Sequence, residues 1–103
     1  MYVILWEYLV KAEHITEFEE IYAAKGTWEQ LFQKHSDYLG TELLRDTSYP
    51  QRYITIDRWG SAEAYNSFQR EWQEEYKELD ARCEGLTERE AFLGTFLSVH
   101  SGG

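Results

Sequence analysis

The side chains best suited to chemistry fall on two neighbouring segments that have the composition of β-strands and are joined by a polar loop of hairpin length. If Arg45 pairs with Tyr53, a register that this loop permits, both side chains lie on one face of a sheet. Asp57 and Trp59 then lie on the same face, because side chains alternate along a strand. An arginine and an aspartate placed there could hold a phenol and remove its proton. The alternative is an ion pair at the sheet margin or at the rim of a dimer, which is common on sheet surfaces.

The three histidines are scattered along the chain. His14 begins a helical segment, His35 ends another, and His100 lies near the C-terminus. No two of them have the spacing of metal ligands on a helix, so no metal site is predicted. A solvated side chain is the simplest interpretation of each histidine. His35 is nevertheless a candidate base, because it adjoins the apolar residues Trp28 and Phe32.

A further set of candidates recurs at helical spacing later in the chain. Phe68, Trp72 and Tyr76 form a stripe that could line a ligand pocket, and Tyr65 lies one position off this stripe, where it could reach the pocket rim. The core face of a helix has the same pattern, so ordinary packing is the alternative. The chain contains no glycine-rich phosphate loop, no nucleophile elbow and no CxxC motif.

Hydrophobic periodicity predicts the elements that position these residues. They are a strand at 2–11, a helix at 13–25 that restarts as a short helix ending near His35, strands at 39–46 and 52–59, a long helix at 62–84, and a strand at 91–100. Local signals mark the boundaries. Gly26 is predicted to end the first helix in the left-handed conformation, and 27–30 matches a capping box. Ser61 is the predicted N-cap of the long helix and Gly85 its stop, while 87–90 is predicted to be a turn.

The element order β-α-β-β-α-β predicts a ferredoxin-like α+β fold with a four-stranded antiparallel sheet. One domain is expected over 1–100, with a flexible tail at 101–103. Right-handed crossovers would place both helical connections on one face of the sheet. The other face would be apolar and bare, and a patch of that size is typical of an interface. The pattern therefore predicts a homodimer formed through the sheet face.

Charge and composition exclude several partners. The net charge of −9, from 19 acidic and 10 basic residues, argues against binding to nucleic acid or to an anionic membrane surface. No window is apolar enough to cross a bilayer, and the N-terminus does not have the pattern of a secretory signal. Cys83 is the only cysteine, which rules out an internal disulfide and favours a reducing, cytoplasmic setting.

Four segments also carry a family resemblance: HITEF at 14–18, GTWEQLF at 26–32, YLGTELLRD at 38–46 and RYITIDRW at 52–59, followed by Ser61 and Ala64. With these segments the chain resembles the antibiotic biosynthesis monooxygenase family over nearly all of its length. The resemblance implies a dimeric α/β barrel. It also implies oxygen insertion into an electron-rich aromatic molecule, without metal or flavin, in a pocket between helices and sheet.

Such chemistry needs a substrate that forms a carbanion or phenolate, a group that takes the proton, and a dry apolar pocket. Trp59 matches the family's tryptophan at the pocket end of the third strand, although core packing at a strand–helix junction is its alternative role. The expected catalytic residues are Asp57, Arg45 and His35. The expected substrate pocket is formed by Trp59, Tyr53, Tyr65, Phe68 and Trp72.

One departure from the family affects the cofactor. Haem-degrading relatives carry a ligand histidine on the second helix, at the position that Phe68 occupies here. Haem binding is therefore not expected, and neither a cofactor nor a metal ion is predicted. The leading hypothesis is a cofactor-independent monooxygenase acting on a small phenol or quinol. Because this fold hosts several activities, a non-catalytic module for ligand binding or dimerisation is the alternative.

Overall fold

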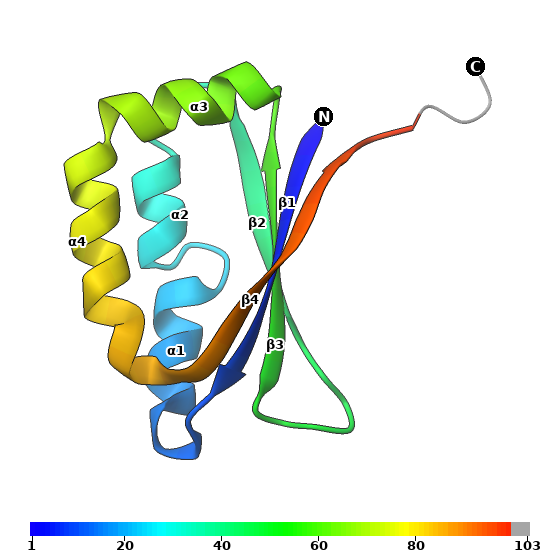
Figure 1. Cartoon of the computed structure of the whole chain (residues 1–103), viewed down its shortest axis with the longest axis vertical. Coiled ribbons are helices and arrows are strands. Elements are labelled where there is room, and N and C mark those ends of the chain that lie inside the picture. Colours follow the sequence, from blue (N-terminus) through cyan, green and yellow to red (C-terminus); the bar gives the residue numbers. More distant parts are fainter. Residues whose placement is uncertain (100–103) are drawn as a thin grey trace.

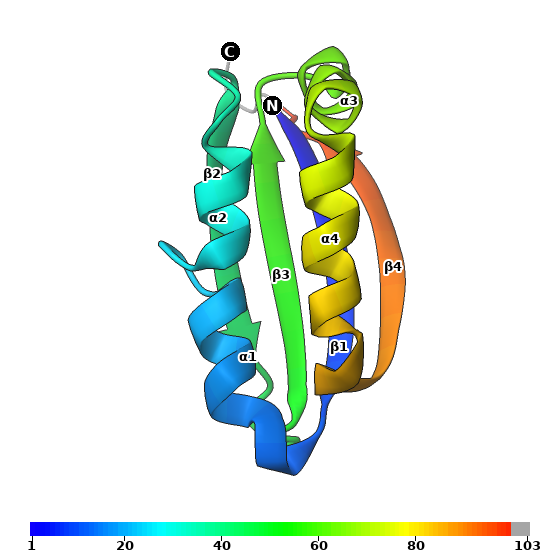
Figure 2. The ribbon, with the colours of Figure 1, turned by 90° about the vertical axis from the view of Figure 1, so that its left-hand side faces the viewer.

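An antiparallel sheet with the strand order β2-β3-β1-β4 forms one layer of the molecule, and the helices form the other. In the computed structural model, which describes residues 1–99, all helices lie on one face of this sheet (Figures 1 and 2). The predicted ferredoxin-like α+β fold is confirmed. The elements are β1 (Tyr2–Val10), the 3-10 turn η1 (Ala12–His14), α1 (Ile15–Tyr22), α2 (Thr27–Phe32), β2 (Tyr38–Arg45), β3 (Arg52–Trp59), α3 (Ala62–Glu71), α4 (Gln73–Cys83), the 3-10 turn η2 (Glu84–Leu86) and β4 (Thr87–Leu97). His100 and the tail predicted at 101–103 lie outside the described residues.

The core lies between the sheet and the helices. Tyr8 pairs with Tyr53 and Ile4 with Asp57, so these positions of β1 and β3 face the helical layer together. Each large apolar side chain that is fully buried there contributes on the order of 2–3 kcal/mol to stability. The largest fully buried side chains are Trp59, Tyr53, Phe18, Phe68 and Val10.

The break between α1 and α2 differs from the prediction. Gly26 is not in the left-handed region, since its φ is −80°. Lys25 adopts that conformation, with a φ of 68°. Gly26 is required for a different reason: a Cβ there would lie 2.6 Å from the carbonyl oxygens of both Glu20 and Ile21. The glycine permits close approach of two backbone segments, which a sequence pattern does not distinguish from a helix stop.

The capping box predicted at 27–30 is also wrong. Gly26 is the N-cap of α2 and makes no side-chain cap bond. Instead, the Glu29 carboxylate accepts a hydrogen bond from the backbone N–H of Lys25, and Gln30 Nε2 donates to the Lys25 carbonyl at 3.2 Å. The left-handed residue is thus held by two side chains from the helix that follows it.

The predicted long helix is two helices. Trp72, with φ −117° and ψ 28°, leaves the helical conformation, so α3 runs across one end of the layer and α4 turns to run along the sheet (Figure 1). The predicted cap is confirmed, because the Ser61 side chain accepts from the N–H of Ala64 at 3.1 Å. Gly85 is not a left-handed stop but lies within η2. The predicted turn at 87–90 is the start of β4, an edge strand whose exposed, polar end lacks the apolar alternation of a buried strand.

The second face of the sheet carries apolar side chains without a helix over them, and we call it the open face. Leu44 pairs with Ile54, and Phe96 with Val3, which places all four on this face. Leu44 is 43% exposed and Phe96 52% exposed, so the face presents apolar surface to solvent.

No helix among residues 1–99 is long and apolar enough to span a membrane.

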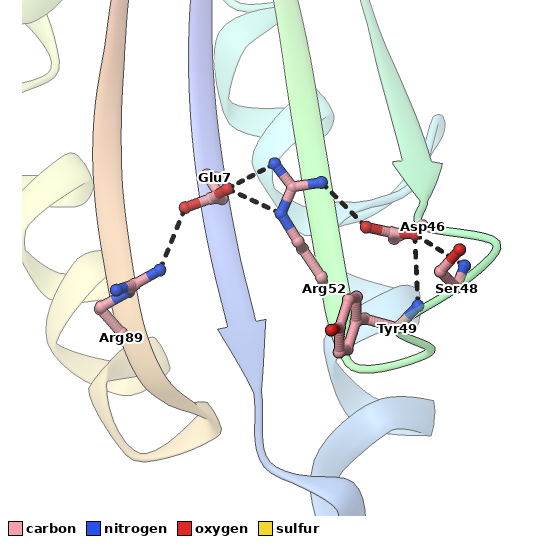
Figure 3. A network of polar contacts seen from close by, with 6 residues as sticks. All are labelled: Glu7, Asp46, Ser48, Tyr49, Arg52 and Arg89. Carbon is pink, nitrogen blue, oxygen red and sulfur yellow. Dashed lines mark hydrogen bonds and ion pairs between the residues drawn. The ribbon is translucent and has the colours of Figure 1, made fainter.

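A network of ion pairs occupies the end of the open face near the β2–β3 hairpin (Figure 3). Arg52 bridges two carboxylates: its Nε donates to Glu7 at 2.7 Å, and another guanidinium nitrogen donates to Asp46 at 2.9 Å. Arg89 approaches Glu7 from β4, at 3.4 Å. The charges at this end of the open face therefore satisfy one another.

Candidate functional site

A pocket of about 110 Å³ that opens to solvent lies between the helices and the face of the sheet that they cover. In Figure 2, α1 and α2 form one column of helix and α4 the other, with β3 running between them. The pocket is lined from both columns and from all four strands. Its lining residues are Trp6, Tyr8, Tyr22, Trp28, Phe32, Thr41, Thr55, Asp57, Tyr76, Asp80 and Glu90.

Aromatic rings form most of the pocket wall, and they are locked against one another. The Trp28 ring centroid lies 5.1 Å from that of Tyr76 and 6.1 Å from that of Tyr22. Tyr22 in turn meets Tyr8 edge-on at 5.0 Å. Such edge-to-face contacts fix the rings in place, so the pocket offers flat, preformed surfaces to a planar ligand.

Asp57 brings a carboxylate into this aromatic surrounding. It lies opposite Thr41 in the β2–β3 pairing, and the Thr41 hydroxyl donates to Asp57 Oδ1 at 2.7 Å. Burial raises the pKa of Asp57 to about 6; the hydrogen bond from Thr41 opposes this rise, and the charge of Glu29 adds to it. A carboxyl with that pKa is half ionised near pH 6 and mostly ionised at neutral pH, so it can accept a proton there and is a stronger base than an ordinary aspartate.

A chain of polar groups leads from Asp57 away from the pocket. The Tyr38 hydroxyl contacts the Thr41 hydroxyl and donates to Glu29 at 3.3 Å. The backbone N–H of Thr41 also donates to Glu29, at 3.4 Å. These hydrogen bonds hold Glu29 near Asp57, and the negative charge of Glu29 raises the pKa of Asp57.

Two buried polar atoms of the lining residues have no hydrogen-bond partner within the described protein: Trp28 Nε1 and Thr55 Oγ1. The Tyr22 hydroxyl is near Trp28, and the Tyr8 hydroxyl is near Thr55, but no hydrogen bond of good geometry satisfies either atom. Leaving such a group unpaired costs about 1–3 kcal/mol.

The predicted register of Arg45 opposite Tyr53 is confirmed, and Asp57 and Trp59 share their face of the sheet. Only Asp57 of these residues lines the pocket. The Arg45 guanidinium lies 3.8 Å from Glu19, and the Tyr53 hydroxyl donates to the same carboxylate. The arginine therefore pairs at the sheet margin with a residue of α1 and not with Asp57.

The other predicted site residues lie behind the pocket wall. Trp59 is fully buried, with Tyr65 at 5.3 Å and Phe68 at 5.2 Å between ring centroids. The His35 ring lies 6.1 Å from that of Trp59, and its Nδ1 accepts from the N–H of Asp37. Trp72 holds Lys34 over its ring at 4.7 Å. None of these side chains lines the pocket. Of the residues considered for the site, the structure brings Asp57 and, from the predicted helical stripe, Tyr76 to it.

Sequence reasoning missed most of the pocket wall. Trp6 and Tyr8 alternate on β1, and Trp28 and Tyr76 lie on helical stripes, so each had a signal for facing the interior. What no local pattern shows is that these elements leave a space between them.

Within residues 1–99, no group of three or more histidine, cysteine, aspartate or glutamate side chains is placed to hold a metal ion.

Comparison with known proteins agrees with this architecture. Residues 1–82 match the family model of the antibiotic biosynthesis monooxygenases. The chain belongs to this family. No curated protein sequence matches it significantly. Among solved structures, a mutant of SnoaB, a cofactor-independent oxygenase from Streptomyces nogalater, superposes with a TM-score of 0.80 at 17% identity, covering 98% of this chain and 95% of SnoaB. A Deinococcus radiodurans protein named after the same family has a TM-score of 0.76 at 13% identity, with 100% and 97% covered. At these identities the likeness shows a shared fold.

Proposed function

We propose that this member of the antibiotic biosynthesis monooxygenase family is a cofactor-independent monooxygenase that acts on an electron-rich aromatic molecule of the phenol or quinol type. The observation that carries the proposal is Asp57, a carboxylate with a raised pKa inside a pocket walled by aromatic rings. Two unpartnered donors, Trp28 Nε1 and Thr55 Oγ1, lie in the same lining. The SnoaB likeness supports the choice of reaction.

In this mechanism Asp57 accepts the proton of the substrate hydroxyl and leaves a phenolate in an apolar surrounding. The ring then supplies electrons to molecular oxygen, a carbon–oxygen bond forms, and the resulting peroxide loses water. One oxygen atom ends in a new carbonyl of the quinone product. The other leaves as water, with one hydrogen from the ring C–H and one from the hydroxyl. The substrate itself is the reductant.

The unpartnered donors have a clear place in this sequence. Negative charge develops first on the phenolate oxygen and then on the peroxide. Donors that are already in place and shielded from water stabilise such charge strongly, because they need not reorient during the reaction. In this proposal, ligand binding brings the developing charge to Trp28 Nε1 and the Thr55 hydroxyl, and Thr41 holds the Asp57 carboxylate in its orientation.

Oxygen consumption tests the proposal. The purified protein is treated with chelator, freed of flavin and given anthrones, naphthols and quinols, while incorporation of labelled oxygen gas is followed by mass spectrometry. We expect uptake above the spontaneous rate, reduced about 100-fold or more in Asp57→Asn, because general-base catalysis typically contributes that much. Asp37→Asn, which removes an exposed carboxylate outside the pocket, should retain full activity. Equal uptake in the Asp57 and Asp37 variants contradicts the assignment of the base.

A non-catalytic ligand-binding module of the same fold is the second candidate. The observation that favours it is that unpartnered buried donors need only a bound ligand and no turnover. Saturable binding of a naphthol, with labelled oxygen absent from the bound compound, would establish it. Haem is not expected as the ligand, because Phe68 is fully buried and provides no ligand atom; titration with haem should therefore give no Soret shift.

We further propose that the protein acts as a homodimer joined through the open face, in the cytoplasm, where its one buried thiol, Cys83, stays reduced. The apolar surface at Leu44 and Phe96 supports this, since isolated domains rarely expose such a patch. Light scattering should give a dimeric mass at micromolar concentration. Leu44→Glu and Phe96→Glu should give monomers, whereas Tyr49→Glu, in the exposed hairpin, should not. A monomeric mass for the unmodified protein rules out this dimer.

A further inference from the structure

Three carboxylates line the pocket, and no basic side chain does: Asp57, Asp80 and Glu90. None of the three forms an ion pair within the described residues. Elsewhere the chain does neutralise acidic groups, as the network around Arg52 shows (Figure 3). The pocket thus keeps negative charge without a protein counter-ion.

Two of these carboxylates mark the mouth of the pocket. Asp80 comes from α4 and Glu90 from β4, and both side chains are exposed at the point where the two elements approach. Partial burial raises the pKa of Glu90, and the charges of Asp80 and then Glu84 raise it further. Asp80 and Glu90 also line a second hollow together, so the two mouth carboxylates are close to each other. The neighbouring cation on β4, Arg89, is directed to the open face, where it pairs with Glu7 (Figure 3).

The pocket interior has the complementary property. Six aromatic rings line it, and the faces of aromatic rings carry partial negative charge that attracts cations. Trp28 and Thr55, two lining residues that are at least nine-tenths buried, each carry a polar atom without a hydrogen-bond partner in the described protein, Nε1 and Oγ1.

We propose that the ligand of this pocket is an aromatic amine, with its ring system packed against the Trp28–Tyr76 pair and its protonated nitrogen between Asp80 and Glu90. The inference rests on the proposed function in so far as both assign the ligand to this pocket, but it does not depend on oxygen chemistry. It narrows the substrate from any electron-rich aromatic molecule to one with a basic nitrogen at the end facing solvent. It also disfavours aromatic carboxylates, which would meet three like charges.

Binding of three naphthalenes that differ only in charge tests the inference: naphthylmethylamine, naphthalenemethanol and naphthoic acid. Dissociation constants are measured by calorimetry at neutral pH and low salt, without oxygen, so that no turnover occurs. We expect the amine to bind about tenfold more tightly than the alcohol, and the acid to bind more weakly than both, a range that corresponds to modest, partly screened charge interactions. Added salt should reduce the preference for the amine.

The double variant Asp80→Asn with Glu90→Gln should bind the amine and the alcohol equally. Its matched control is Glu71→Gln with Glu78→Gln, which removes the same amount of charge from exposed positions outside the pocket and should leave the preference unchanged. Equal affinities in the unmodified protein, or the same loss in both double variants, overturn the inference, as does failure of all three compounds to bind. Oxygen uptake with neutral naphthols is a separate measurement: uptake without an amine preference leaves the proposed function standing and removes only this inference.

Discussion

Replacing Asp57 with asparagine should make the protein more stable at neutral pH while it reduces oxygen uptake about 100-fold or more. Burial raises the pKa of Asp57 from its ordinary value of 3.8 to about 6. The folded state therefore binds the proton more tightly than the unfolded state. Asparagine keeps an oxygen that can accept from Thr41 but carries no charge, so it removes the free energy of burying a carboxylate.

The sign and size of the effect follow from the two pKa values. The aspartate is protonated in both states well below pH 4, where variant and parent should differ little. As pH rises from about 4 to 6, the unfolded state ionises first and the parent loses stability. Above pH 7 the difference between a pKa of 3.8 and one of about 6 corresponds to about 3 kcal/mol. The added amide N–H₂ of asparagine needs partners, so we expect a net gain of about 1–3 kcal/mol.

Urea unfolding of both proteins at several pH values between 4 and 8 measures this difference. Asp46→Asn is the control of opposite sign. The backbone N–H groups of Ser48 and Tyr49, together with Arg52, lower the pKa of Asp46, so its contribution is present at neutral pH and is lost as pH falls through the lowered pKa. A neutral-pH loss of stability in Asp57→Asn, or a gain that is the same at every pH, would refute the reasoning that Asp57 is a destabilised carboxylate.

Two further predictions concern the fold. Gly26→Ala should lower the free energy of unfolding by about 1–3 kcal/mol, because its Cβ would lie 2.6 Å from two carbonyl oxygens. Gly85→Ala is the control and should be tolerated, since a Cβ there would have nothing within 4 Å. Equal melting temperatures for the two variants would contradict this account. Phe68→Ala should cost about 3–5 kcal/mol in chemical denaturation, since the ring is fully buried against Trp59 and Phe32, and a loss below about 1 kcal/mol would mean that the core collapses around the cavity.

The fold could be predicted because its signals are local and repeated. The β-branched and aromatic composition placed the strands to within a few residues, and Ser61 caps α3 as predicted. The predictions that were wrong depend on contacts between distant residues. Gly26 is required by the carbonyls of the preceding helix, and the chain leaves the helical conformation at Trp72. Neither feature alters the periodicity of the sequence.

The site was less predictable than the fold for the same reason. Arg45 and Tyr53 share a face with Asp57, as the register predicted. Only part of that face lines the pocket, and Arg45 and Tyr53 lie outside that part. Arg45 forms its ion pair with Glu19 of α1 and not with the aspartate. The feature that marks Trp28 is its Nε1 atom, which is buried without a hydrogen-bond partner in the described protein. That is a property of the packed structure and not of the residue type.

The polar groups of this molecule therefore fall into two kinds that sequence cannot separate. On the open face, Glu7, Arg52 and Asp46 satisfy one another, as is typical of groups that stabilise a structure (Figure 3). In the pocket, burial of Asp57 disfavours its ionised form, and Thr55 Oγ1 lacks a hydrogen-bond partner in the described protein. Selection for stability alone would replace both pocket groups with apolar ones of similar shape. Their presence at the one aromatic-walled pocket of the described residues is what ligand binding and proton transfer require, and this contrast is the physical basis for locating function there.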